Sequence, residues 1–294
     1  MLNDYRVRVA TLGLLAALLL LLTSAQAMTS GAGASRDTPS CGWIAEFDPS
    51  DFSDPTNIDN EWSLMVPGTQ MTLVGVADDA PHSVVSTVTD LTKVINGVRT
   101  VVILETDLSE GEVAETELAF KAQDDDGNVW NLGEYPEEYE DGEFVGAPST
   151  WIAGVEDAEA GLLMQGDPRV GTGYYLQGSV PSIGFLDCAR VLNTGEQACV
   201  PFSCYENVLV TDEWSPLEPS EGHQRKSYAS GVGNIAVGAT GSSGEVLELV
   251  AVVHLSPSDL VKVRREALNL EKRAYRTSDV YGETPPAERG GTGN

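Results

Sequence analysis

The densest group of titratable side chains in this chain lies within residues 222–229. It contains His223, Arg225 and Tyr228, types that suit a lyase, in which an arginine neutralises a substrate carboxylate while a histidine or tyrosine moves the proton. On an alternating strand, however, His223 and Arg225 share one face and Tyr228 lies on the other. A surface strand that pairs with acidic neighbours explains the same residues. His82 is the fourth candidate catalytic residue.

A second candidate site consists of aromatic and polar residues between positions 130 and 177. Sugar CH faces stack on aromatic rings, while sugar hydroxyl groups need polar partners. Carbohydrate binding is therefore one interpretation of this cluster, and ordinary core or sheet-face positions are the other. The candidate ligand-binding residues are Trp130, Trp151, Tyr174, Tyr175 and Gln177.

Metal and cofactor motifs are weak in this chain. The acidic run that begins at Asp124 resembles the start of an EF-hand loop, but in that frame the first and twelfth positions are Ala122 and Gly133, so both defining carboxylates are missing. A hairpin turn explains the run better, with a weak surface calcium site as the alternative. The cysteines lack a C-x-x-C pair, and no Gly-x-Ser-x-Gly occurs. We expect no metal and no cofactor.

The four cysteines predict two disulfides, because exported chains keep such bonds. Residues 187–200 read as two short strands around a turn at Asn193-Thr194-Gly195, and a Cys188–Cys199 bridge across that hairpin is geometrically plausible. Cys41 would then pair with Cys204 and hold the N-terminal segment against the domain.

Short alternating or β-branched runs follow one another from about residue 61 to residue 255 and predict antiparallel strands. Asn96-Gly97 and Asp126-Gly127 predict tight hairpin turns, since these residue types tolerate positive φ. The absence of alternating strands and helices argues against a parallel sheet. We therefore expect a mainly β protein, an antiparallel meander that forms a curved sheet or a partly closed barrel. The predicted strands are 71–76, 83–88, 98–104, 113–122, 129–132, 174–177, 183–191, 207–211, 225–229, 234–238 and 246–253.

One amphipathic helix is predicted over residues 256–278. Ser256 is a suitable N-cap and Pro257 fits the first helical position. Apolar residues recur at helical spacing from Leu260 to Ala274, while basic residues occupy the other faces. This helix packs on its own acidic β domain or docks to a partner, and the acidic run 134–143 is a candidate neighbour. Residues 279–294 are predicted to be a disordered tail.

The first 27 residues predict a signal peptide: basic residues, an apolar run too short to span a membrane, and Ala25-Gln26-Ala27 as a cleavage site. Residues 28–60 follow as a linker and extended segment. The formal net charge of −28 excludes nucleic acid and anionic lipid surfaces as partners, because binding to them needs clustered Lys and Arg. We expect an extracellular or cell-envelope monomer with no transmembrane segment after cleavage.

Four strings carry a resemblance: AQDDDGNVW at 122–130, WIAGV at 151–155, YASGVG at 228–233 and VYGETPPAE at 280–288. They resemble a family of exported, β-rich bacterial proteins labelled hypothetical, and the resemblance covers most of residues 60–288. It implies export and brings no established activity.

The sequence thus favours an exported, disulfide-stabilised β protein that binds a ligand, either a carbohydrate or a small apolar molecule, in a concave surface. An extracellular polysaccharide lyase or hydrolase is the alternative, and an envelope scaffold whose terminal helix engages a partner is a third hypothesis. Paired carboxylates in a cleft would favour hydrolysis.

Overall fold

The computed structural model describes residues 40–240 and 244–290. The predicted signal peptide and the first part of the predicted linker lie outside these residues. Among the helices in the described part of the chain, none is long and apolar enough to cross a membrane.

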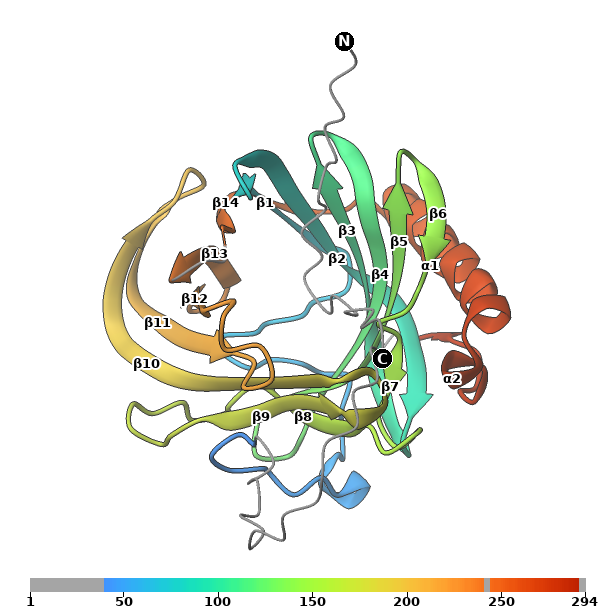
Figure 1. Cartoon of the computed structure of the whole chain (residues 1–294), viewed down its shortest axis with the longest axis horizontal. Helices are drawn as coiled ribbons and strands as arrows, with labels where there is room; N and C mark the ends of the chain where they lie inside the picture. Colours follow the sequence, from blue (N-terminus) through green and yellow to red (C-terminus); the bar gives the residue numbers. More distant parts are fainter. Residues whose placement is uncertain (1–39, 241–243, 291–294) are drawn as a thin grey trace, which may run out of the picture.

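The fold is a closed antiparallel barrel of twelve strands with one long C-terminal helix on its outer surface (Figure 1). β1 pairs with β14 on one side and with β2 on the other, and this double pairing closes the ring. The mainly β, antiparallel prediction is confirmed, and closure is complete. Around the ring the strands are β1 (Thr69–Ala77), β14 (Val246–His254), β13 (Gly233–Thr240), β12 (His223–Ala229), β11 (Cys204–Trp214), β10 (Phe185–Cys199), β9 (Tyr175–Val180), β8 (Glu159–Met164), β5 (Val129–Glu140), β4 (Glu112–Gln123), β3 (Val98–Ser109) and β2 (Ala80–Ile95).

Shorter elements lie beside this ring. β6 (Glu143–Gly146) and β7 (Trp151–Ile152) pair with β5, and β15 (Glu288–Arg289) pairs with β2. Two short 3-10 helices, η1 (Pro49–Asp51) and η2 (Pro181–Ile183), complete the β-rich part.

The predicted turns are present. Asn96 and Gly97 have φ values of 47° and 84° between β2 and β3, as a tight hairpin requires. In the β4–β5 connection, the Asp124 carboxylate accepts hydrogen bonds from the backbone N–H groups of Asp126 and Asn128. It also accepts one from the Trp130 indole. Asp124 is therefore part of the turn.

The C-terminal helix α1 (Pro257–Thr277) begins where the sequence indicated. The Ser256 side chain accepts from the backbone N–H of Asp259, and Pro257 is the first helical residue. Ala267, Leu270 and Ala274 are buried against the outer face of the sheet. The predicted disordered tail is partly wrong, because a second helix, α2 (Asp279–Gly282), and β15 are ordered and fold back over β2.

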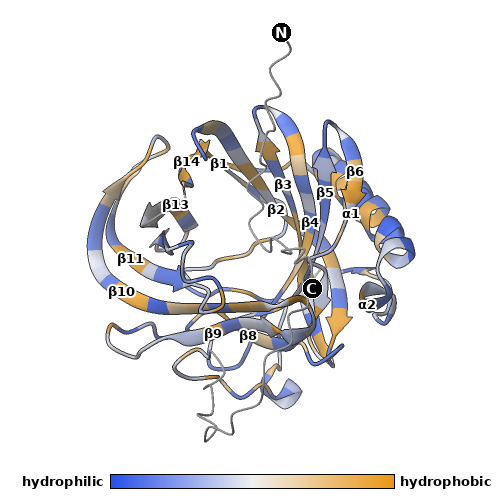
Figure 2. Ribbon diagram, viewed as in Figure 1, coloured by the Kyte–Doolittle hydropathy of each residue, from blue (hydrophilic) through white to orange (hydrophobic). Residues whose placement is uncertain are grey.

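Apolar residues fill both sides of the sheet, as the alternating hydropathy along the strands in Figure 2 reflects. Outside, Val102, Leu104, Leu118 and Phe120 pack under α1 and α2. Inside, one cluster brings together residues from strands far apart in the ring, so these positions identify the inward face. They are Val88, Val101, Ile103, Ala119, Val129, Met164, Val191, Leu209 and Tyr228.

The N-terminal segment contributes to this inner cluster. Ile58 is buried in it, with Trp62 and Met65 packed beside it. Asn60 fixes the segment, since its side-chain N–H group donates to the carbonyls of Gly127 and Gln165. The segment therefore fills the apolar end of the barrel interior.

The structure contains two disulfides among its described residues, but the predicted pairing is wrong. The bonds are Cys41–Cys188 and Cys199–Cys204. The error came from the predicted hairpin: residues 185–199 form one strand, β10, whose register shifts near Asn193 absorb the residues that suggested a turn. The real turn lies between β10 and β11, and Cys199 is directly opposite Cys204 across it.

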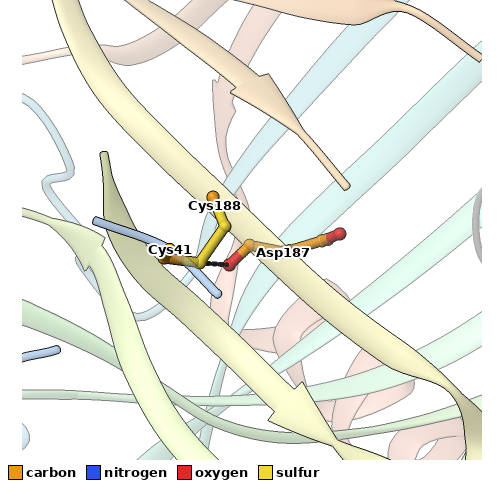
Figure 3. Close-up of a disulfide and its surroundings, with 3 residues drawn as sticks. All are labelled: Cys41, Asp187 and Cys188. Carbon is orange, nitrogen blue, oxygen red and sulfur yellow. Dashed lines mark hydrogen bonds between the residues drawn. A yellow bond between two sulfur atoms is a disulfide. The ribbon is translucent and has the colours of Figure 1, made fainter. Parts of the chain in front are cut away.

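Cys41 reaches the outer face of β10 instead. Figure 3 shows its bond to Cys188 beside Asp187, and the Sγ of Cys41 lies 3.4 Å from the Asp187 carbonyl oxygen. A disulfide sulfur has no hydrogen to donate, so this approach is a van der Waals contact. The bond holds the segment from residue 41 against β9 and β10, where Trp43 bridges to Tyr175.

Candidate functional site

The inward face of the barrel changes from apolar to acidic along β3 and β4. Beyond Ile103, the next inward residues of β3 are Glu105 and Asp107. On β4 their partners are acidic as well: Glu105 lies directly opposite Glu117, and Asp107 lies directly opposite Glu115. Like charges directly opposite each other destabilise a sheet. Nothing in the packing of the outer face requires these acids, so they need another explanation.

The same change occurs on other strands. On β10 the inward positions run from Val191 through Ala189 to Asp187. On β11 they run from Leu209 through Thr211 to Glu213. Glu134 of β5 is opposite Ala119. We refer to the inward-facing carboxyl groups as the acidic lining; they are Glu105, Asp107, Glu115, Glu117, Glu134, Asp187, Glu213 and Glu245.

Two lysines neutralise part of the acidic lining. Lys121 Nζ donates to Asn131 Oδ1 at 2.8 Å and to Glu134 Oε1 at 3.1 Å. Lys226 Nζ lies 2.8 Å from Glu213 Oε2. Glu134 also accepts from the Trp151 indole at 3.2 Å. The Lys121–Glu134 pair is therefore held in place by Asn131 and Trp151.

His82 is the third cation. Its Nε2 lies 3.1 Å from Asp107 Oδ2 and 3.5 Å from Glu245 Oε1, contacts that are close enough for ion pairs but not aligned as hydrogen bonds. The interactions with Asp107, and then with Glu245, outweigh burial and raise the pKa of His82 to about 10. His82 is therefore an imidazolium at neutral pH.

The remaining carboxyl groups outnumber these cations, and their pKa values show the consequence. Burial, followed by repulsion from neighbouring carboxylates, raises the pKa of Glu115 to about 8 and holds that of Glu117 well above its usual value. Burial likewise raises the pKa of Glu105 and brings that of Asp187 to about 7. Burial and mutual repulsion thus outweigh the attraction of Lys121 and Lys226 for these acids, and Glu115 and Asp187 hold protons near neutral pH.

Glu134 behaves in the opposite way. Burial acts to raise its pKa, but the Lys121 ammonium and hydrogen bonds from Asn131 and Trp151 outweigh it and keep the pKa below the usual value. A carboxylate with a lowered pKa therefore lies diagonally across the β4–β5 pair from Glu117, whose pKa is raised. Perturbed titratable groups of this kind are concentrated at functional sites.

An unpaired hydroxyl group also faces this lining. Tyr175 is fully buried on the inward face of β9, opposite Ala189, and its hydroxyl has no hydrogen-bond partner among the described residues. Glu213 and Tyr228 act on it electrostatically. A buried hydroxyl without a partner costs free energy, so it indicates a place where a ligand can supply one.

Water reaches the acidic lining from one end of the barrel. Along β3, Val101 and Ile103 are buried, whereas Glu105, Asp107 and Ser109 are partly exposed. The side chains of Lys226 and Glu134 are 26% and 25% exposed although they face inward. The lining is therefore open beside the β3–β4 turn, while apolar residues and the N-terminal segment fill the other end.

The lining does not form a compact metal centre. Within residues 40–240 and 244–290, no three His, Cys, Asp or Glu side chains converge to hold a metal ion. The carboxyl groups are instead spread along several strands, an arrangement that fits an extended organic ligand better than a single ion.

A second polar cluster lies on the outer face of β10–β12. The Asp212 carboxylate, 3% exposed, accepts from Tyr174 Oη at 2.7 Å and from Arg190 Nε at 3.1 Å. His223 Nδ1 lies 3.1 Å from the same oxygen, and the Trp214 ring stacks on the imidazole at 5.3 Å. This arrangement fixes the His223 ring and turns its Nε2 away from Asp212.

The four candidate catalytic residues do not meet. His223 and Arg225 lie on the outer face of β12, and Tyr228 lies on the inner face, where its hydroxyl is 3.5 Å from Glu213. His82 faces inward on β2. The alternation of the strand separates the two pairs, as the sequence pattern indicated.

The predicted aromatic cluster is dispersed as well. Trp130, Trp151 and Tyr175 are buried core residues, so they cannot present an open platform to a sugar. Tyr174 belongs to the outer Asp212 cluster. Gln177 is buried on β9.

The sequence itself contains a signal for the lining, outside the motifs described above. Glutamate is disfavoured in strands, yet Glu105-Thr106-Asp107 and Glu115-Thr116-Glu117 place acids at alternate positions in two neighbouring strand-forming runs. That pattern predicts an acidic sheet face. The direction of this face, inward or outward, is not encoded in the alternation.

The chain matches no family model and no curated protein. It is similar to the solved structure of a protein from Bacteroides fragilis, predicted to be exported and of YmcC-like fold, at 14% identity and a TM-score of 0.36, over 66% of this chain and 99% of that one. A protein from Parabacteroides distasonis, predicted to be a lipoprotein, gives 9% identity and a TM-score of 0.35 over 66% and 100%. At these values the similarity supports no inference about function.

Proposed function

We propose that this protein is an exported binding protein that takes up an organic cation, an aliphatic amine or polyamine, inside its barrel. The excess of inward-facing carboxyl groups over cations carries the proposal. A bound ammonium group would let the protonated acids ionise, and so would replace unfavourable like-charge pairs with favourable opposite-charge pairs. The two disulfides fit an oxidising compartment outside the cytoplasm.

The distribution of the groups supports an elongated ligand. Inward residues on one strand recur every second position, about 7 Å apart, so carboxyl groups line a path rather than a point. An apolar ligand fits less well, because it would leave the acidic lining without partners.

Calorimetric titration with spermidine at pH 7 and moderate salt tests the proposal. We expect saturable binding by the chain purified from an exporting host, and about tenfold weaker binding by Glu117→Gln or Glu105→Gln, since each removes one carboxylate that would face the ammonium. Glu248→Gln is the matched control, because Glu248 is exposed on the outer face of β14. Equal affinities for all of these proteins, or no binding by the wild type, would reject an interior amine site.

The Asp212–His223 pair favours a second candidate activity, elimination in a uronate polymer. His223 Nε2 would take the proton from the carbon next to the sugar carboxylate, the electron pair would form a C=C bond, and the glycosidic C–O bond would break, with water protonating the leaving oxygen. Arg225, exposed on the same face, would bind the carboxylate.

The assay for this activity is the ultraviolet absorbance of unsaturated uronate ends in a panel of uronate polysaccharides. We expect His223→Ala to abolish any signal and His254→Ala, which changes an exposed histidine at the end of β14, to preserve it. Silence of the wild type across the panel rejects the lyase.

A further inference from the structure

A separate pocket lies between α1 and the outer face of the sheet at β4–β6. Its volume is about 500 Å³, within the range of ligand sites in proteins. One wall is a single face of α1 and the other is the outer surface of β4 and β5. The residues that carry the argument are Glu112, Thr116, Tyr139, Arg265, Glu266 and Asn269.

The helix is attached to the sheet by other residues. Arg264 forms a bidentate pair with Asp90, and Arg273 forms one with Glu137, which is fully buried. Ala267 and Ala274 provide the apolar contact. The six residues named above are therefore not needed to position α1, and Arg273, which also lines the pocket, is already paired with Glu137.

Five polar side chains of the pocket have no side-chain partner in the part of the chain that the structure describes. They offer carboxylates, a hydroxyl, an amide and a guanidinium, from Glu112, Glu266, Thr116, Asn269 and Arg265. A single exposed side chain without a partner is ordinary, but here these groups converge on one hollow. Such a mixed set fits a ligand with many hydroxyl groups.

Aromatic surface lies beside these groups. Tyr139 lines the pocket, with its hydroxyl donating to Glu137 Oε2 at 2.7 Å, and the ring of Phe144 meets it edge-on at 6.0 Å. Phe144 is 44% exposed, which is high for a large aromatic residue. Rings next to amide and carboxylate groups match the CH faces and hydroxyl groups of a sugar.

The charge of the pocket selects among sugars. Carboxylates and cations are both present in its walls, and Lys262 and Arg273 are already paired with Asp259 and Glu137. The chain as a whole has a net charge of −28, which repels a polyanion. We propose that this pocket binds a segment of a neutral polysaccharide. The site is distinct from the acidic lining, because it lies on the opposite face of the same strands.

Affinity electrophoresis and calorimetry with maltohexaose, cellohexaose and laminarihexaose test this proposal. We expect one of these neutral glucans to bind with a Kd of about 1 mM or tighter. Phe144→Ala and Asn269→Ala should each weaken binding about tenfold. Arg276→Gln is the matched control, since it changes an exposed residue in the last turn of α1 outside the pocket.

Two results would overturn the proposal: no binding of any of the three glucans by the wild type, or equal binding by Phe144→Ala, Asn269→Ala and the control. Because Phe144 and Asn269 are surface residues, their variants should keep the wild-type unfolding temperature, and that measurement separates lost binding from lost folding. Spermidine affinity should be unchanged in both variants, which distinguishes this site from the barrel interior.

Discussion

Lys93 and the acidic lining both bury charged groups, but only one of the two regions is balanced. Lys93 Nζ donates to Glu271 Oε1 at 2.8 Å, to Tyr275 Oη at 3.0 Å and to the Pro285 carbonyl at 2.7 Å. All three of its protons are used, and one carboxylate neutralises it. Burial lowers the pKa of Lys93, and Glu271 opposes that effect.

The surroundings of Lys93 explain what this pair does. Its ammonium lies 4.4 Å from the centroid of the Tyr281 ring, and Glu271 also accepts from the backbone N–H of Ala287. The pair thus joins β2, α1, α2 and the segment before β15. It is a structural connection that holds the C-terminal region on the barrel.

The acidic lining has the reverse character. Its carboxyl groups exceed the available cations, Glu105 and Glu117 are directly opposed, and the Tyr175 hydroxyl has no partner among the described residues. Burial of charge therefore does not by itself indicate function. A buried group of charges that lacks counter-ions and hydrogen-bond partners does indicate function, because folding alone would not favour it.

The largest expected effect is at Lys93. Lys93→Met leaves the Glu271 carboxylate buried without a cation, and we expect a loss of about 3–5 kcal/mol in the free energy of unfolding. Urea denaturation measures it. Adding Glu271→Leu should restore much of the loss, since the unpaired charge is then absent. A loss below about 1 kcal/mol for Lys93→Met would show that the pair is not the structural connection inferred here.

A smaller effect is expected where α1 meets the acidic run 134–143. Arg273→Gln leaves Glu137, which is fully buried, without its bidentate partner, and should cost about 2 kcal/mol. Arg265→Gln should cost less than about 0.5 kcal/mol, because Arg265 is exposed and lies in the pocket between α1 and the sheet without a side-chain partner among the described residues. Thermal unfolding at low salt compares the two. Equal costs would mean that the acidic run does not hold the helix.

The pH dependence of stability follows from the raised pKa values. Glu115, at about 8, and Asp187, at about 7, bind protons more tightly in the folded state, so the stability they contribute is complete below about pH 4 and is lost as pH rises through these values. His82, at about 10, extends the loss to higher pH. Glu134 and Asp212 have lowered pKa values and oppose the trend below about pH 4.

We therefore expect maximal thermal stability between about pH 4 and 6 and a decline toward pH 9. Glu115→Gln should remove on the order of 1 kcal/mol of that decline, allowing for the solvent that reaches this side chain. Unfolding temperatures measured from pH 4 to 9 for both proteins provide the check. If the unfolding temperatures of the two proteins fell in parallel with pH, the raised pKa of Glu115 would be contradicted.

The smallest expected effect has the opposite sign. Glu117→Gln removes one of two directly opposed carboxyl groups, so stability at pH 8 should increase by about 1 kcal/mol. Urea denaturation at pH 8, with Glu248→Gln as the control, measures this gain. A loss of stability would place Glu117 among the structural charges, together with Glu271.

The sequence by itself determined the local structure. Asn96-Gly97 specified a hairpin, Ser256 and Pro257 specified the start of a helix, and the alternating runs specified strands, because each depends on backbone preferences and on nearest neighbours. Export, predicted from residues 1–27, lies outside the described residues and stays a prediction. The excess of acidic over basic residues follows from composition alone.

Only the tertiary structure decided which distant residues meet. Closure of β1 between β2 and β14, the Cys41–Cys188 pairing and the capture of Lys93 by Glu271 join residues far apart along the chain. The tertiary structure also decided which strand face points inward, and so turned alternate glutamates into an acidic lining. Side chains alternate between the two faces of a strand, so the pattern is the same whichever face points inward. Only the packing of apolar residues around a closed ring determines which face is enclosed.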